Sequence, residues 1–248
     1  SERWEDGAGR MRMSRSEHPG STGGWTASQV EYDLLGRVKR QSVPTEVSVS
    51  GSTWTPSGDD NRGTGVWLWT YQKYDWKGRV VRRINTDGVD SPALNDSDEI
   101  ISYEGCGCAG GMVTSIRGAL VPVPGQTNVY ARRSLKIYED ILGRTIKTET
   151  MNWDETTPYT TTTSQFNGRD QAVSLRQYEG SESGTNPFQV GVMTYDGHGR
   201  LKSQHKPEQS AGSNTTFNYN MDDSIESVID ARGAIESRNY EARGLLIS

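Results

Sequence analysis

The sequence has few of the residues that build a large apolar core. Hydrophobic residues make up 32% of its 248 positions, and phenylalanine occurs only three times. There is no run of about 18 apolar residues, so we expect no membrane span in this segment. The start, Ser1-Glu2-Arg3-Trp4, lacks an initiator methionine and the charged-then-apolar pattern of a signal peptide. We interpret the chain as a piece of a longer protein or a processed product, which leaves secretion of the parent open.

Positive charge is also scarce. The chain has 27 Lys and Arg against 32 Asp and Glu, which gives a formal net charge of −5. A protein whose main partner is nucleic acid carries a basic surface that contacts phosphates. The charge balance therefore excludes nucleic acid as the main partner.

Cysteine is limited to Cys106 and Cys108. A disulfide between them would be strained, because a single residue separates them. Two sulfurs cannot complete a zinc site, and His18, His198 and His205 have no ligand spacing with them. A nucleophilic cysteine needs a base and an orienting group, and the run EGCGCAGG identifies no residue for either role. We expect a tight turn here, no metal site and no cofactor, with a cross-link or lipid attachment as open alternatives for the pair.

Glycine and the amphipathic aromatic residues are abundant instead. The chain has 28 Gly, 11 Tyr and 7 Trp. Tyrosine and tryptophan favour a pleated, half-buried surface, and glycine favours turns. This mixture is typical of a β-rich protein and argues against a helical bundle.

A six-residue pattern recurs along the chain: an aromatic residue, an acid, two variable residues, glycine and arginine. Strand-like runs precede and follow each copy. Internal repetition of this kind indicates a repeat architecture. Unmodified copies begin at Tyr32, Tyr74 and Tyr195, copies one residue longer begin at Trp4 and Tyr138, and degenerate copies begin at Tyr103, Phe166, Tyr219 and Tyr240.

Each copy is predicted to be the turn of a β-hairpin. In YDGHGR, Asp196 can accept hydrogen bonds from backbone N–H groups, and Gly199 can take the left-handed conformation that closes a type I turn with a bulge. Arg200 then begins the return strand. Leu35 and Lys77 stand where His198 stands, and a catalytic site would not tolerate that variation, so we expect no catalytic residues. The turn residues assigned in this way are Tyr32, Asp33, Gly36, Arg37, Tyr74, Asp75, Gly78, Arg79, Asp140, Gly143, Arg144, Tyr195, Asp196, Gly199 and Arg200.

The hairpins are expected to form one β-sheet region over residues 1–248, without helices. Segments rich in Gly, Ser, Pro or acids are predicted to be exposed loop insertions near residues 50–66, 86–99, 118–128 and 179–188. The run Asn95–Glu99 offers carboxylates for calcium but lacks the glycine of a regular calcium loop, so a solvated loop is favoured.

The repeated YDxxGR pattern resembles the YD-repeat, or Rhs (rearrangement hotspot), family, and matching units run from about Trp4 to Leu246. The resemblance implies an all-β fold of consecutive antiparallel hairpins in a sheet that spirals into a partial shell or a solenoid-like strip. In bacterial Rhs proteins and insecticidal toxin complexes the shell holds a toxin, and in teneurins a related shell belongs to an adhesion receptor. This chain has too few units to close a large shell alone, and nothing in it resembles the family's closing segment.

Aromatic residues form one further candidate surface. Trp67, Trp69 and Tyr71 are two residues apart and are predicted to share one face of a strand. Such a row can bind sugars or a protein, or it can pack on the next strand, which we favour. Loops or turns are expected at Trp54, Trp76 and Trp153.

Together these observations favour a non-enzymatic structural scaffold of a secreted or cell-surface protein. We expect it to form part of a shell or a self-assembling filament through hairpin stacking. Its expected partners are flanking repeats of the same parent chain or other copies of itself, with a toxin cargo or a surface glycan as further candidates. The alternatives are a carbohydrate- or cell-surface-binding adhesion module and a toxin-encapsulating shell fragment. An enzyme would need convergent polar side chains that the repeats do not supply.

Overall fold

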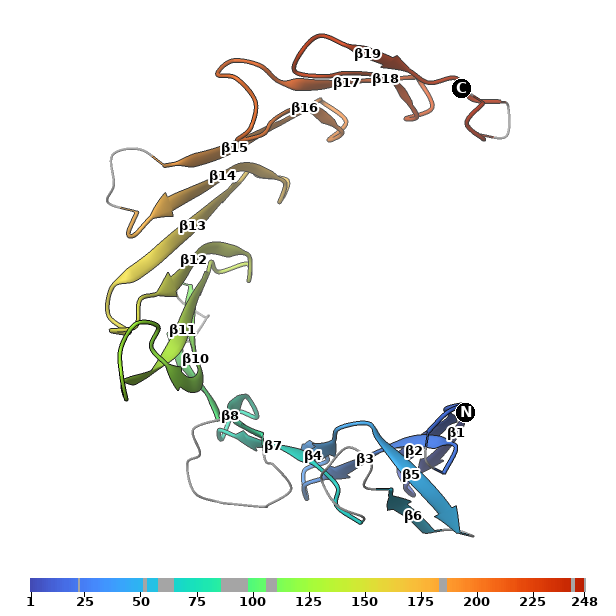
Figure 1. The fold of residues 1–248 in the computed structure, drawn as a ribbon. Coiled ribbons are helices and arrows are strands. Elements are labelled where there is room, and N and C mark those ends of the chain that lie inside the picture. Colours follow the sequence, from blue (N-terminus) through green and yellow to red (C-terminus); the bar gives the residue numbers. More distant parts are fainter. Residues whose placement is uncertain are drawn as a thin grey trace. The chain divides into compact units, whose positions relative to one another are not determined.

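The computed structural model describes residues 1–21, 23–50, 53–57, 65–85, 98–105, 111–182, 187–241 and 244–247. Within these ranges the regular structure consists of nineteen β-strands and no helix (Figure 1). Sequential strands pair antiparallel throughout most of the chain. The all-β fold of consecutive antiparallel hairpins is therefore confirmed. No helix that could span a membrane occurs in the described part of the chain.

The chain forms two compact units. Unit 1 comprises Ser1–Ser102 and Ile116–Arg133, and unit 2 comprises Tyr103–Ser115 and Ser134–Ser248. The strands of unit 1 are β1 (Glu2–Glu5), β2 (Met11–Glu17), β3 (Trp25–Tyr32), β4 (Val38–Ser42), β5 (Thr45–Ser50), β6 (Thr53–Pro56), β7 (Trp69–Tyr74) and β8 (Val80–Asn85). Three strands have residues in both units: β9 (Glu99–Glu104), β10 (Met112–Pro122) and β11 (Tyr130–Glu139). Unit 2 continues with β12 (Thr145–Met151), β13 (Pro158–Phe166), β14 (Ala172–Glu179), β15 (Gln189–Tyr195), β16 (Leu201–His205), β17 (Thr215–Tyr219), β18 (Ile225–Ile229) and β19 (Ile235–Ser237).

A bend between β4 and β5 shapes unit 1. Strand β3 pairs with β2 on one side and with both β4 and β5 on the other. Pro44 lies between the two short strands and has no N–H to offer a ladder. At the bend the Ser42 Oγ accepts the Gln29 backbone N–H at 2.8 Å, so a side chain satisfies a donor at the break in the ladder.

A small apolar core forms where β3, β5 and β6 meet. Ala27, Val47 and Trp54 are its buried centre. The sequence predicts Trp54 in an exposed loop near residues 50–66, and this prediction is wrong. Thr53–Pro56 form β6, which pairs with β5, and Trp54 is only 7% exposed. Met13, Trp25, Val49 and Trp67 pack against the centre.

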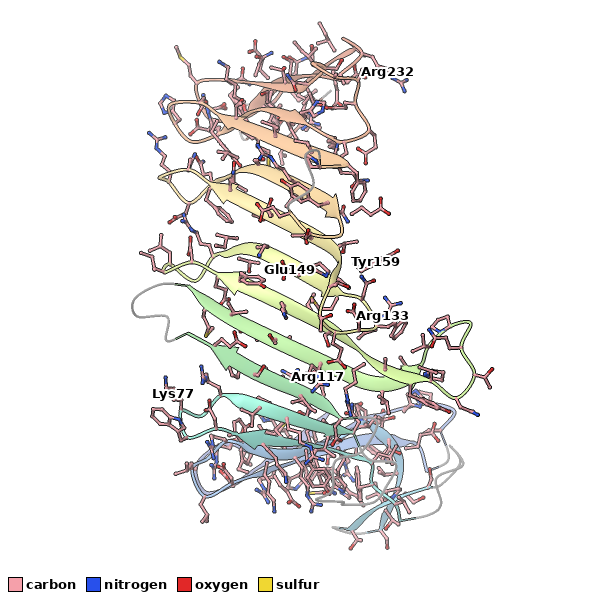
Figure 2. The ribbon with its side chains drawn as sticks, turned by 90° about the vertical axis from the view of Figure 1, so that its left-hand side faces the viewer. Lys77, Arg117, Arg133, Glu149, Tyr159 and Arg232 are labelled. Atoms are coloured by element: carbon pink, nitrogen blue, oxygen red, sulfur yellow. The ribbon has the colours of Figure 1, made fainter. Side chains whose placement is uncertain are left out.

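Unit 2 is a meander in which each strand from β12 to β19 pairs with the next one along the chain (Figures 1 and 2). Polar residues occupy both faces, because successive positions of a strand such as β13 (PYTTTTSQF) alternate between them. Among the described residues of this unit, the buried hydrophobic side chains are Met151 and Tyr178. Unit 2 therefore gains little from an apolar core, and contacts between neighbouring hairpins carry more of its stability.

The other predicted insertions are only partly exposed loops. Residues 86–97 lie outside the described residues, but Asp98 is fully buried and pairs with Arg82, as a buried charge requires. Residues 118–122 belong to β10, and Val123 is 5% exposed. Around residues 179–188 the chain ends β14 and then begins β15, and positions 183–186 lie outside the described residues. Trp76 and Trp153 lie in turns, as predicted.

Candidate functional site

The repeated turn is the feature that the sequence emphasises most. At YDGHGR, Asp196 donates its N–H to the Arg200 carbonyl at 2.9 Å, and Gly199 donates to the Asp196 carbonyl at 3.0 Å. The Asp196 Oδ1 accepts the N–H groups of His198 and Arg200, and its Oδ2 accepts the Arg200 Nε–H at 2.7 Å. Gly199 has φ 89°, and the ladder shifts register at Tyr195. The same hydrogen bonds surround Asp6, Asp33, Asp75 and Asp140.

The arginines of four turns, Arg10, Arg37, Arg144 and Arg200, also contact the next repeat. The Arg200 guanidinium lies 4.5 Å from the centroid of the Tyr219 ring, within range of a cation–π interaction. The Tyr219 hydroxyl donates back to the carbonyl of Leu201, the residue after Arg200, at 2.8 Å. We call this pair of contacts the arginine–tyrosine lock. It joins one hairpin to the following hairpin through both a side chain and the backbone.

The lock recurs in unit 1. Arg10 lies 4.6 Å from the ring centroid of Tyr32, whose hydroxyl donates to Met11 O at 2.9 Å. Arg37 lies 4.4 Å from the ring centroid of Tyr74, and the Tyr74 hydroxyl donates to Val38 O at 2.7 Å. The acceptor is in each case the first residue of the strand that leaves the earlier turn. The sequence pattern therefore specifies contacts between repeats as well as the turn within each repeat.

Two copies in unit 2 carry half of the lock. Arg144 lies 4.9 Å from the centroid of the Phe166 ring, which has no hydroxyl to donate. Tyr195 keeps the hydroxyl bond, to Ala172 O at 2.8 Å, although Gln171 stands in the arginine position. The Gln171 Nε2 donates instead to the Gly199 carbonyl at 2.6 Å, which maintains a link between the same two repeats.

The degenerate copies that begin at Phe166 and Tyr219 accept the arginines of the turns that precede them. In FNGRDQ and YNMDDS an aspartate replaces the glycine, and Asp170 and Asp223 have φ 62° and 67°. Arg144 Nη1 lies 2.6 Å from Asp170 Oδ1, and Arg200 Nη1 lies 2.6 Å from Asp223 Oδ1. Aspartate tolerates the left-handed region better than most side chains, and the ion pair offsets the remaining strain. Unit 2 thus alternates turns that donate an arginine with turns that receive one.

Charges within the turns are stabilised in their ionised forms. Hydrogen bonds from the Arg144 guanidinium and backbone hold the pKa of Asp140 below its ordinary value, and Asp140 raises the pKa of Arg144. At Asp196, desolvation raises the pKa, but the hydrogen bonds from Arg200 outweigh it and the pKa is lowered. Both oxygens of each carboxylate accept hydrogen bonds from groups of the same turn, so these carboxylates stabilise the turn.

Tyr138 departs from the lock. Its hydroxyl donates to Glu149 Oε2 at 2.7 Å, and Glu149 also accepts from the Lys147 ammonium at 3.0 Å. Glu149 lies in the middle of a strand (Figure 2) and is 8% exposed. Burial, together with the Glu149 carboxylate, raises the pKa of Tyr138 to about 12. All three groups are satisfied by one another, which indicates a structural network on one face of the sheet.

Only two of the three residues in the predicted aromatic row, Trp69 and Tyr71, lie on the same strand. Trp69 and Tyr71 lie on β7, but Trp67 precedes that strand and packs against the core of unit 1, so the prediction that all three share a strand face is wrong. Tyr71 is 7% exposed. The Arg40 guanidinium lies 4.0 Å from the Trp69 ring centroid and donates to the Tyr71 hydroxyl at 3.1 Å. Arg40, a residue of the same unit, therefore contacts both Trp69 and Tyr71.

Sequence reasoning missed a second aromatic cluster in unit 1. The Arg15 guanidinium lies 4.4, 5.0 and 5.3 Å from the ring centroids of Trp25, Trp54 and Trp4. Its Nη2 also lies 2.6 Å from a carboxylate oxygen of Glu2. The residues come from β1, β2, β3 and β6, and no spacing along the chain relates them. Through these contacts β1 packs against the apolar core of unit 1.

The histidine and acidic residues that the sequence offers as candidates do not form a metal-binding group in the described part of the chain. His198 is exposed at its turn, and no group of three or more His, Asp or Glu side chains is placed to hold a metal ion there. Cys106, Cys108 and Asn95 lie outside the described residues, so the predictions for the cysteine pair and for most of the acidic run remain predictions.

No family model matches the sequence, and no curated protein matches it. Among solved structures, a Tc holotoxin pore from Photorhabdus luminescens is 12% identical with a TM-score of 0.36, and the similarity covers 99% of this chain and 15% of that chain. A TcdB2-TccC3-TEV structure is 14% identical with a TM-score of 0.44, covering 91% of this chain and 13% of that chain. A porin-like protein from Bacteroides uniformis is 9% identical with a TM-score of 0.24, covering 95% and 92%. The chain thus spans about a seventh of the two toxin chains, and none of these scores is high enough to carry an argument.

Proposed function

We propose that the chain is a non-enzymatic wall segment of a secreted or cell-surface YD-repeat protein. The observation that carries the proposal is the arginine–tyrosine lock, which joins successive hairpins at Arg10–Tyr32, Arg37–Tyr74 and Arg200–Tyr219. A sheet held by such contacts does not depend on a second layer. Unit 2 has this property, because polar residues occupy both of its faces and few of its side chains are buried.

The wall is proposed to extend by pairing of strand edges, either with flanking repeats of the parent chain or with another copy. A strand at the edge of a sheet offers unpaired N–H and C=O groups that add a further strand. Toxin encapsulation is a candidate role of the larger assembly, since this chain would supply one part of its wall.

Edge pairing is tested at Ser237 in β19. The Arg238 N–H donates to Glu226 O at 2.9 Å, and N–H groups alternate in direction along an antiparallel strand, so the Ser237 N–H points away from β18. Ser237→Pro removes that outward donor and leaves the β18–β19 bond in place. We expect the chain to form concentration-dependent end-to-end particles in sedimentation velocity, Ser237→Pro to reduce them, and Ser237→Ala to behave like the parent. A stable monomer at high concentration would contradict self-assembly and restrict the partners to flanking repeats.

The adhesion alternative receives less support from the aromatic row. Because Trp67 packs on the core and Arg40 covers Trp69, the double variant Trp67→Ala/Trp69→Ala is expected to destabilise unit 1. Thermal unfolding and binding to a glycan array separate the two functions. A variant that keeps its unfolding temperature and loses glycan binding would favour adhesion. Turnover in a general hydrolase screen would contradict the non-enzymatic assignment.

A further inference from the structure

The tips of two neighbouring turns in unit 1 carry apolar side chains that the fold does not use. Leu34 and Leu35 lie between β3 and β4, and Trp76 lies between β7 and β8. Their exposed fractions are 105%, 77% and 88%, respectively. Large hydrophobic residues exposed side by side on a protein surface commonly mark a contact site.

The two turns are adjacent in the sheet. Strand β4 pairs directly with β7, and Arg37 at the base of the first turn lies over Tyr74 at the base of the second. Turns that are two strand spacings apart lie about 10 Å from each other. The tips of Leu34, Leu35 and Trp76 therefore form one patch, which we call the apolar tips.

Folding does not require apolar residues at these positions. The turn at Asp6 has Gly7 and Ala8 at its tip, and the turn at Asp196 has Gly197 and His198, yet both make the same hydrogen bonds as the turn at Asp33. A type I turn accepts most residues, and polar ones are common there. The apolar tips therefore expose hydrophobic area that the turns do not need for folding. This exposure indicates a contact with another molecule.

We propose that the apolar tips insert into the interfacial region of a lipid bilayer. Tryptophan favours the membrane–water interface, and leucine supplies apolar area that is buried among acyl chains. Two hairpin tips are convex, so a protein partner would need a matching groove, whereas a bilayer deforms around them.

Size and charge favour lipid over a second protein. A stable protein interface buries about 800 Å² per partner, while an aromatic side chain supplies about 150–250 Å², so three tip residues fall short of it. The two turns carry three bases (Arg37, Lys77, Arg79) against two acids (Asp33, Asp75), a net charge of +1. The Lys77 ammonium lies 5.0 Å from the centroid of the Trp76 ring. A positive charge beside the inserted residues suits an anionic headgroup.

The same chemistry recurs in unit 2. Ile141 and Leu142 form the tip of the turn at Asp140 and are 69% and 64% exposed. We propose this tip as a second anchor, because a single small anchor binds a membrane only weakly.

Vesicle co-sedimentation tests the proposal with the intact chain. We expect it to bind vesicles of phosphatidylcholine and to bind more strongly when phosphatidylserine is added. Leu34→Ser/Leu35→Ser/Trp76→Ser is expected to lower the partition coefficient by about tenfold or more, since burying one leucine corresponds to about that factor. Lys77→Gln is expected to remove only the additional binding due to phosphatidylserine.

Two control variants keep the turn geometry. His198→Ser changes a tip that is already polar and is expected to leave vesicle binding unchanged. Gly197→Leu/His198→Leu creates a new apolar tip and is expected to increase binding. The turn can hold the larger side chain, because a Cβ at Gly197 would have no atom within 4 Å. Unchanged thermal unfolding of every variant shows that the fold is retained, as expected for exposed tips.

Two outcomes overturn the proposal. The first is no vesicle binding by the parent chain, and the second is equal binding by the parent and the triple tip variant. If the parent does not bind vesicles but self-associates, and the triple tip variant abolishes that self-association, the tips are instead a contact between copies of this chain.

Discussion

Tyr219 and Arg200 hold two successive hairpins together through a reciprocal pair of contacts. The guanidinium of Arg200 stacks on the Tyr219 ring at 4.5 Å, and the Tyr219 hydroxyl returns a hydrogen bond to the carbonyl that follows Arg200. Because the two contacts run in opposite directions along the chain, neither hairpin can shift along the other without breaking one of them. The register between repeats is therefore fixed by side chains as well as by the backbone ladder.

The hydroxyl half of the lock is tested by exchanging tyrosine and phenylalanine. Tyr219→Phe removes the bond to Leu201 and is expected to lower the free energy of unfolding by about 1 kcal/mol. Phe166→Tyr adds a hydroxyl at the equivalent position, where the carbonyl of Thr145 corresponds to that of Leu201, and is expected to raise it by about 0.5–1 kcal/mol. Urea denaturation measures both changes. Destabilisation by Phe166→Tyr would contradict the equivalence of the two repeats.

The relation between donor and acceptor turns is tested by a double-mutant cycle at Arg200 and Asp223. The two side chains share an ion pair at 2.6 Å, so removing either one should remove the same interaction. We expect Arg200→Ala and Asp223→Asn each to lower the unfolding temperature, and the double variant to lower it by less than the sum. Asparagine is chosen because it tolerates φ 67° as aspartate does.

Lys202, which is exposed in the following strand, provides the control for this cycle. Lys202→Ala combined with Asp223→Asn is expected to give additive changes in unfolding temperature, since no contact joins the two positions within the described residues. Additive effects for Arg200 and Asp223 as well would mean that the ion pair contributes nothing measurable, as is common for exposed pairs.

The turns could be predicted from the sequence because their determinants are local. An aspartate and a glycine within one six-residue unit suffice to specify the bonds around Asp196 and the positive φ of Gly199. The strand content followed from the Thr, Val and aromatic runs on either side. These signals depend on neighbours along the chain, so comparison of sibling copies was enough to separate a repeated turn from a catalytic loop.

The second role of the arginine could not be predicted in the same way. Its partner Tyr219 stands nineteen residues after Arg200 and belongs to another hairpin, so the contact depends on the register between repeats. For the same reason Asp170 and Asp223 looked like losses of the motif, although they receive the preceding arginine. Trp54 was misplaced because β6 is a strand of four residues that lies outside the repeated pattern.

Acid is expected to weaken the turns over a defined range of pH. Hydrogen bonds from the backbone N–H and side chain of Thr157 and the backbone of Thr156 lower the pKa of Asp154 from 3.8 to about 2. A lowered pKa contributes stability that is present above the unfolded value and is lost as the pH falls through the folded value. The Asp154 contribution should thus be complete above about pH 4 and be lost towards pH 2.

Unfolding curves of the parent and of Asp154→Asn, measured from neutral pH to pH 2, test this expectation. The difference in stability between the two proteins should be constant above about pH 4 and shrink as the pH falls towards 2. A difference that grows in acid would reverse the sign of the linkage and contradict the lowered pKa of Asp154.

Substitutions at two glycines can distinguish the free-energy cost of backbone strain from the contribution of an arginine that packs between repeats. Gly9 and Gly36 occupy the same turn position with φ 73° and 79°, so alanine at either should cost about 1–2 kcal/mol in strain. A Cβ at Gly9 would meet no atom within 4 Å, whereas a Cβ at Gly36 would lie 2.8 Å from Arg10 Nη1. Gly36→Ala must therefore push the guanidinium away from the Tyr32 ring, which adds about 0.5–1 kcal/mol, the value of an exposed cation–π contact.

Urea denaturation of the two alanine variants measures that difference, and the same pair in an Arg10→Ala background is the control. Without the guanidinium both alanines meet only backbone strain, so their costs should become equal. If Gly36→Ala and Gly9→Ala already lower the free energy of unfolding by the same amount in the parent, displacement of the Arg10 guanidinium has no measurable effect on stability. The stacking of Arg10 would then add nothing measurable to the contact between repeats at Tyr32, which also includes the hydroxyl bond to Met11 and the Arg12 guanidinium 5.9 Å from the ring centroid.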